Sequence, residues 1–326
     1  MTTRTRYFVI VSLLVLIVGL GTGLVAYYTG FQMTALARRG GPQELQYVPS
    51  QVAVVAYADV RAVMTSELRQ RIHEAAPVPE TGQQEFENKT GINIETDIDH
   101  VVACLEPGPQ GDNGEGLLLA RGRFNDAKIE SLMRAHGAMV EDYHGKRLIT
   151  ADKYQHGDTL SVAFLEPGLV AVGSTPVVRR AIDLRNGGDN VTNNDELMGQ
   201  VRSLESGNAW AVGRFDALRT KAHIPEGMAS QIPPITWFSV SGRVNGGVRG
   251  VIRAETADEQ SATNLRDVVR GFMALAKMQA GAKPEFNAML QSLELGGTGK
   301  TVALSFAVPA EAFDALARAH GHQRPK

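Results

Sequence analysis

The sequence predicts an α+β fold: one transmembrane helix at the N-terminus, then antiparallel sheets with helices packed on one face. Three observations predict it. Residues 7–28 form one uncharged apolar run. The rest of the chain alternates strand-like segments, several of them joined by short turns, with amphipathic helical segments. Similar short strings recur where a strand gives way to a helix, which favours an internally duplicated unit.

The apolar run YFVIVSLLVLIVGLGTGLVAYY occupies residues 7–28. At about 1.5 Å of rise per residue, a helix of this length crosses the hydrocarbon core of a bilayer, which is about 30 Å thick. Tyr and Phe residues near both ends suit the two headgroup layers. We therefore expect a single-pass anchor in a lipid bilayer at residues 7–28, a cytoplasmic tail at residues 1–6 and a tether at residues 29–46.

The positive-inside rule favours a cytoplasmic N-terminus by a small margin. Arg4 and Arg6 precede the span together with the amino terminus, whereas Arg38 and Arg39 follow it. The sequence shows no second apolar run of about 18 residues. The rest of the chain is then expected on the far side of the plasma (inner) membrane, as one extracytoplasmic (periplasmic) domain.

Two further features of the N-terminal segment leave alternatives open. Ala35-Leu36-Ala37 has the small-x-small form of a signal-peptide cleavage site, so the segment could be removed after Ala37. The apolar run exceeds the usual ~7 to 15 residues of such peptides, which favours an uncleaved signal-anchor. Gly19 and Gly23 have the GxxxG spacing with which some transmembrane helices dimerise, so a homodimer through them is a second possibility.

Length and charge limit the organisation of the remaining chain. It is longer than the usual ~100 to 200 residues of one domain, so we expect two α+β subdomains, at residues 47–206 and 207–320, and a polar tail at residues 321–326. The formal net charge is −2, and Lys and Arg form no run that could follow a phosphate backbone. Nucleic acid is therefore not expected as a partner. The single cysteine, Cys104, lies in an apolar strand-like run and is expected to be an inert core residue.

The first half of the chain alternates strands with capped helices. A strand at 51–59 leads into a helix carrying Val60, Met64, Leu68 and Ile72, and a surface loop is expected at 77–91. An edge strand is predicted at 92–105. The remaining elements, in chain order, are a strand at 117–124, a helix capped by Asn125, hairpins at 139–150 and 160–172, a helix with its N-cap at Thr175, a helix capped by Asn194 and a strand at 209–214.

The second half is predicted to follow the same plan. A hairpin joins 234–244 to 247–255 across Asn245-Gly246, and the capping box from Thr256 to Glu259 opens the longest helix outside the span. The apolar stripe of this helix is expected to pack against the hairpin, and it comprises Leu265, Val268, Val269, Phe272, Met273 and Ala276. The last elements are a short helix around Phe286, Met289 and Leu290, strands at 293–295 and 301–308, and a helix at 310–319.

The duplication is suggested by two strings. Residues 120–125 (ARGRFN) and 211–216 (AVGRFD) share Ala, Gly, Arg, Phe and an Asx residue in register, each at a strand-to-helix junction. Comparable junctions occur at 56–60 and 305–313. The alternative is that such junctions resemble one another because helix-capping chemistry is limited.

Motifs that would carry chemistry are incomplete. Gly296 to Thr301 resembles a phosphate loop, but Glu294 occupies the position of its first glycine and a strand, not a helix, follows. Asn93, Glu95 and Asp97 alternate like calcium ligands, yet an EF-hand would need Gly at Ile98 and Glu at Cys104. His73-Glu74 lacks the second histidine of a zinc helix, and His320 and His322 lie in a polar tail. No catalytic, cofactor-binding or metal-binding residue is therefore predicted. We expect no cofactor, and we expect that the protein is not an enzyme.

The layout resembles one group of proteins. Val48-Pro49-Ser50 before an apolar strand, the segment FENKTGI at 86–92 and Asp97-Ile98-Asp99 are similar to uncharacterised membrane-anchored bacterial proteins with DUF3352-type domains of unknown function. The resemblance covers most of the outer domain and implies fold and location, but no active site. We therefore expect a non-enzymatic interaction or scaffold module of the cell envelope, with another envelope protein as a further partner. The alternative is a carrier of an apolar ligand such as a lipid, bound between sheet and helices.

Overall fold

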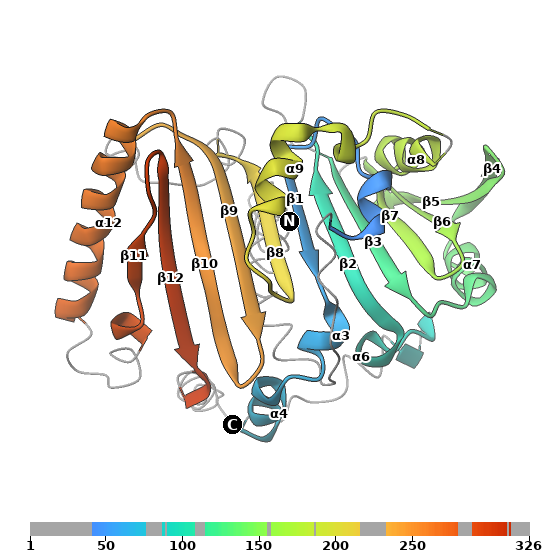
Figure 1. Cartoon of the computed structure of the whole chain (residues 1–326). Coiled ribbons are helices and arrows are strands. Elements are labelled where there is room, and N and C mark those ends of the chain that lie inside the picture. The colour runs from blue at the N-terminus through green and yellow to red at the C-terminus, as the bar shows by residue number, and fades with distance from the viewer. Residues whose placement is uncertain are drawn as a thin grey trace. The chain divides into compact units, whose positions relative to one another are not determined.

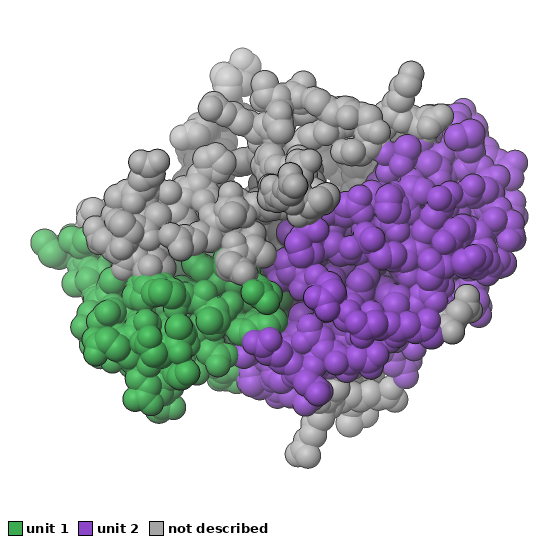
Figure 2. Space-filling view, turned by 90° about the horizontal axis from the view of Figure 1, so that it is seen from above, with its two compact units in different colours: residues 1–34, 62–78, 204–326 green, residues 35–61, 79–203 purple. Residues whose placement is uncertain are grey.

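The computed structural model describes residues 41–75, 87–88, 90–107, 115–154, 158–185, 187–215, 233–279, 289–311 and 313. They form an α+β fold with antiparallel pairing of the strands inside each of two compact units (Figure 1). Unit 1 comprises residues 1–34, 62–78 and 204–326, and unit 2 comprises residues 35–61 and 79–203 (Figure 2).

Several features expected at the ends of the chain lie outside the described residues. These are the tail at 1–6, the span at 7–28 with Gly19 and Gly23, residues 29–40 of the tether, and the polar tail at 321–326. None of the helices within the described ranges combines the length and apolar character needed to cross a membrane.

Unit 2 contains a sheet in the order β1-β2-β3-β7-β6-β5-β4. Its strands are β1 (Val54–Ala58), β2 (Ile98–Leu105), β3 (Gly116–Gly122), β4 (Met139–Tyr143), β5 (Lys146–Tyr154), β6 (Asp158–Glu166) and β7 (Leu169–Ser174). The two predicted hairpins are confirmed as β4–β5 and β6–β7. In the first, His144 and Gly145 have φ of 50° and 74°, the left-handed pair that a tight two-residue turn requires.

Two helices of unit 2 begin at Asn residues that the sequence marks as N-caps. Asn125 Oδ1 accepts from Lys128 N and starts α7 (Asp126–Ala135), and Asn194 Oδ1 accepts from Leu197 N and starts α9 (Asp195–Arg202). The apolar side of α8 (Thr175–Leu184) is buried as predicted and contacts β6 and β7. The shorter elements are η1 (Gln43–Tyr47), α6 (Ile94–Asp97) and η3 (Val191–Asn193), while α3 (Val60–Val63) spans the boundary between the units.

Unit 1 contains a sheet in the order β11-β12-β10-β9-β8. Its strands are β8 (Ala209–Arg214), β9 (Ile235–Val244), β10 (Gly247–Thr256), β11 (Glu294–Gly296) and β12 (Thr301–Pro309), and its helices are α4 (Glu67–Ala75) and α12 (Glu259–Gln279). The predicted β9–β10 hairpin is confirmed. Figure 1 shows α12 standing beside β11 and β12.

The helices α4 and α12 contact the same face of the unit 1 sheet. Leu68 of α4 packs in a cluster with Val248 of β10, whereas Leu265 of α12 packs in a second cluster with Ala254 of the same strand. Val248 and Ala254 are an even number of residues apart, so their side chains point to one face. Among the described residues of unit 1, α4 and α12 thus lie on one face of the sheet.

Four sequence-based predictions are wrong in detail. Residues 92–105 do not form one edge strand, because Asn93 caps the short helix α6 and β2 then lies between β1 and β3. The helix expected after Val60 is interrupted, and Ser66 caps the new helix α4 through Arg69 N. The N-cap of α8 is Ser174, one residue before Thr175. The N-cap contact of α12 is made by Asp258, which accepts from Ser261 N, and not by Thr256.

The largest correction concerns Phe272. The sequence predicts that this ring packs in the core, but it is 45% exposed, whereas Leu265 on the same helix is 7% exposed. The buried arc of α12 comprises Ala262 and Leu265, with Val269 packed against them. Phe272 lies seven residues after Leu265 and so points to nearly the same side of the helix. Its greater exposure therefore reflects its place along the helix, whose second half is less covered than its first.

Part of the element order is common to the two units, whereas β4 and β5 of unit 2 have no counterpart among the described residues of unit 1. In unit 2 a meander of three strands, β1 to β3, is followed by α7, and β7 returns to pair with β3. In unit 1 the meander β8 to β10 is followed by α12, and β12 returns to pair with β10. A helical segment follows the returning strand in each: α8 after β7, and residues from Ala310 after β12. The two similar strings do not fall on corresponding strands. Residues 120–125 begin in β3, the third strand of unit 2, whereas residues 211–216 begin in β8, the first described strand of unit 1.

Candidate functional site

A partly buried ionic cluster lies in unit 2 between η1 and the sheet. His100 of β2 and Arg121 of β3 are directly opposite one another on paired strands, so their side chains share one face. Glu44 and Tyr47 come from η1, and Glu166 is the last residue of β6. Elements far apart in the sequence thus bring five polar side chains together.

Arg121 is the centre of this cluster. Its Nε donates to Oε1 of Glu44 at 2.8 Å, and its Nη2 donates to Oε2 of Glu166 at 3.1 Å. The hydroxyl of Tyr47 donates to Oε1 of Glu166. Nε2 of His100 lies 3.1 Å from Oε2 of Glu44. One guanidinium therefore bridges two carboxylates.

Contacts and burial within the cluster shift the pKa values of its acidic groups. Burial of Glu44 raises the pKa of its carboxyl, but His100 and Arg121 together outweigh burial and lower that pKa to about 2. The hydrogen bond from Tyr47 has the largest effect on the Glu166 carboxyl and lowers its pKa. Burial opposes this effect, and the contact with Arg121 adds to it, so that the pKa of Glu166 is lowered. Burial and the neighbouring Glu166 raise the pKa of the Tyr47 hydroxyl. A general acid or base works best with a pKa near the working pH, and these three groups are shifted away from neutrality. The arrangement suits a clamp that fixes η1.

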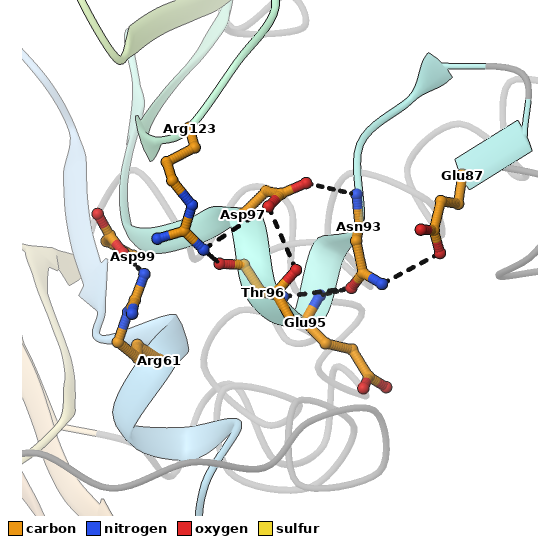
Figure 3. Close-up of polar contacts among 8 residues, drawn as sticks. All are labelled: Arg61, Glu87, Asn93, Glu95, Thr96, Asp97, Asp99 and Arg123. Atoms are coloured by element: carbon orange, nitrogen blue, oxygen red, sulfur yellow. Dashed lines mark hydrogen bonds and ion pairs between the residues drawn. The ribbon is translucent and has the colours of Figure 1, made fainter.

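The acidic residues around α6 are occupied by structural contacts (Figure 3). Asn93 Oδ1 accepts from the backbone N–H groups of Glu95 and Thr96, while Asn93 N donates to Oδ2 of Asp97 at 2.9 Å. Nδ2 of Asn93 donates to Oε2 of Glu87 at 3.1 Å. The alternating pattern that resembles calcium ligands thus serves to begin a helix.

Two arginines complete this region. Arg123 donates to the carbonyl oxygen of Thr96 and lies 3.7 Å from Oδ1 of Asp97, and Arg61 forms an ion pair with Asp99 (Figure 3). Across the described ranges, no group of three or more His, Cys, Asp or Glu side chains is arranged to hold a metal ion.

The other candidate residues from the sequence are not part of the cluster around Arg121. Cys104 is 6% exposed in β2, and burial raises the pKa of its thiol, as expected for an inert core residue. Thr301 begins β12, so a strand follows Lys300 as predicted. His73 lies in α4, whereas His320 and His322 lie outside the described residues.

The C-terminal half of α12 carries an exposed apolar surface. Phe272, Leu275 and Met278 are 45%, 55% and 79% exposed, and we call these three residues the α12 ridge. From Val268 to Gln279 the helix contains two charged residues, Arg270 and Lys277, and no acidic residue. Exposed large apolar groups at neighbouring positions mark surfaces that contact a partner.

Searches against protein-family models, curated proteins and solved structures found no match. The resemblance to DUF3352-type proteins thus rests on the layout and the short strings of the sequence.

The ionic cluster is not predicted by the sequence analysis, and of the three ridge residues only Phe272 is considered there, as a core residue. A signal for the cluster was present, because His100 and Arg121 interrupt strands that are otherwise rich in apolar residues. Their partners Glu44 and Glu166 could not be identified from spacing, since they lie 77 and 45 residues from Arg121.

Proposed function

We propose that this protein is a non-enzymatic interaction module of the cell envelope, anchored in the plasma (inner) membrane by residues 7–28, with its α+β units outside the cytoplasm. The observation that carries the interaction role is the α12 ridge, three large apolar side chains exposed on one helix. The ionic cluster supports a non-enzymatic role, because its groups are paired and their pKa values are shifted away from neutrality.

The anchor is supported by the sequence. Residues 7–28 are uncharged and long enough to span a bilayer, and the charge balance across them favours a cytoplasmic N-terminus by a small margin. The resemblance in layout to membrane-anchored bacterial proteins points the same way. We further propose that the two units descend from one duplicated plan, because a three-strand meander, a helix and a returning strand come in the same order in each.

The interaction role is tested by photo-crosslinking in native membranes. A photoreactive amino acid placed at Leu275 should form adducts with envelope components in illuminated cells. The matched control is the same amino acid at Thr263, which is exposed on α12 but outside the ridge. Adduct formation that is no higher at position 275 than at position 263 would contradict the proposal.

A carrier of an apolar ligand is the second candidate, and one observation favours it. Ile252 is 42% exposed on the face of the unit 1 sheet that the helices cover, between its half-buried partners Val240 and Leu304. Organic extraction of the purified full chain followed by mass spectrometry would detect a bound lipid. A stoichiometric lipid that is lost in Ile252→Asn would favour the carrier over the surface module.

A further inference from the structure

The α12 ridge is separate from the surface that α12 uses to bind its own sheet. Ala262 and Leu265 are buried against the sheet in the first half of the helix. The ridge residues follow at intervals of three, so each lies next to the previous one on the helix surface. Their exposure rises along the helix, from Phe272 to Met278. The second half of α12 therefore presents an apolar surface of its own.

The charge around the ridge indicates the kind of partner. Arg270 and Lys277 are exposed, and the segment from Val268 to Gln279 contains no acidic residue. One acidic residue just before it, Asp267, forms an ion pair with Arg270 at 2.7 Å. Large apolar side chains combined with lysine and arginine are typical of helices that lie in a membrane interface. Anionic lipid headgroups attract such cations.

The proposed anchor and this surface belong to one chain. Twelve residues, 29 to 40, separate the apolar run from the first described residue. Fully extended, they reach at most about 40 Å. Such a tether makes a second contact with the same membrane effectively intramolecular, so even a weak contact would be populated.

We propose that the second half of α12 docks on the anionic surface of the membrane, with Phe272, Leu275 and Met278 inserted among the lipids and Arg270 and Lys277 at the headgroups. This inference rests on the proposed membrane anchor and names the partner of the α12 ridge. The protein then contacts the bilayer twice, through residues 7–28 and through α12.

The test uses the full chain reconstituted in lipid nanodiscs. An environment-sensitive fluorophore is attached at Met278→Cys, and at Gln260→Cys as an exposed control on the first half of the same helix. Cys104 is buried, so labelling occurs at the introduced cysteine. In discs that contain phosphatidylglycerol, spin-labelled lipids should quench the probe at position 278 several-fold more than the probe at 260. Phosphatidylcholine alone, or Arg270→Gln with Lys277→Gln, should reduce that difference.

The outcomes separate the docking from the anchor. Equal quenching at positions 278 and 260, in a chain that still floats with the discs, would overturn the docking and leave the anchor intact. A probe at 278 that is shielded from an aqueous quencher but not quenched by lipids would overturn it in favour of a protein partner, such as a second copy. A chain that does not associate with discs at all would overturn the proposed anchor.

Discussion

Arg121 on β3 donates a hydrogen bond to Glu44 on η1 at 2.8 Å, and so joins the first element of unit 2 to the middle of its sheet. The carboxylate is nearly inaccessible, with its side chain 5% exposed. A buried charge is tolerated when it is paired, and removal of one partner leaves the other uncompensated. The stability of unit 2 should therefore depend on this pair.

The first prediction concerns the pH dependence of that stability. The folded-state pKa of Glu44 is lowered from 4.5 to about 2, so its contribution is present above pH 4.5 and is lost as the pH falls toward 2. Glu44→Gln should destabilise the full chain in detergent by about 2 to 3 kcal/mol at pH 7. Urea unfolding at several pH values should show this difference shrinking in acid. Glu294→Gln, at an exposed position of β11, is the control, and a Glu44→Gln difference that did not change with pH would refute the assignment.

The second prediction compares two glycines of β3. A Cβ at Gly122 would lie 2.0 Å from the carbonyl oxygen of Asp97, whereas the nearest atom to a Cβ at Gly116 is 4.0 Å away. Gly122→Ala must displace the backbone before β2 and should cost about 1 to 3 kcal/mol or more. Gly116→Ala should be neutral or slightly stabilising. Thermal or urea melts of the two variants give the ranking, and equal midpoints would show that β3 does not pass so close to Asp97.

The third prediction compares two apolar residues of α12. Leu265→Ala removes a side chain that is 7% exposed and should cost about 2 to 5 kcal/mol. Phe272→Ala removes a larger side chain, but one that is 45% exposed, and should cost less than about 1 kcal/mol. Urea melts measure both values. A loss at Phe272 as large as that at Leu265 would place the ring in the core and remove the α12 ridge.

Local sequence signals predicted much of the fold. Asn125 and Asn194 cap α7 and α9 because capping needs only an Asx side chain and the next few N–H groups. The β4–β5 hairpin follows from His144-Gly145, two residues that tolerate positive φ. Each of these features depends on fewer than about ten neighbouring residues.

Features that depend on distant partners were not predictable in this way. The position of β2 between β1 and β3 depends on two other strands. The polar residues at its start favour an edge strand when the sequence alone is considered, and the prediction of an edge strand at 92–105 is wrong for this reason. The apolar stripe of α12 contains more residues than the sheet covers. The sequence does not indicate which of these residues are exposed. The cluster around Arg121 needs residues from η1, β2, β3 and β6 at once.

The fourth prediction is that the N-terminal segment stays attached. Its apolar run is longer than that of an ordinary signal peptide, so cleavage after Ala37 is not expected. Intact mass measurement of protein extracted from membranes should give the full chain. A mature N-terminus at Arg38 would show that the segment is a cleaved signal peptide.

The location of the two units outside the cytoplasm is the claim on which the proposed function depends most. The direct measurement is a fusion of alkaline phosphatase, which is active only outside the cytoplasm, after Lys326, compared with a fusion of a fluorescent protein that reports the cytoplasm. If residues 7–28 cross the membrane once with Arg4 and Arg6 inside, the phosphatase fusion should be active and the fluorescent fusion dark. An inactive phosphatase together with a bright fluorescent fusion would place both units in the cytoplasm and contradict the account.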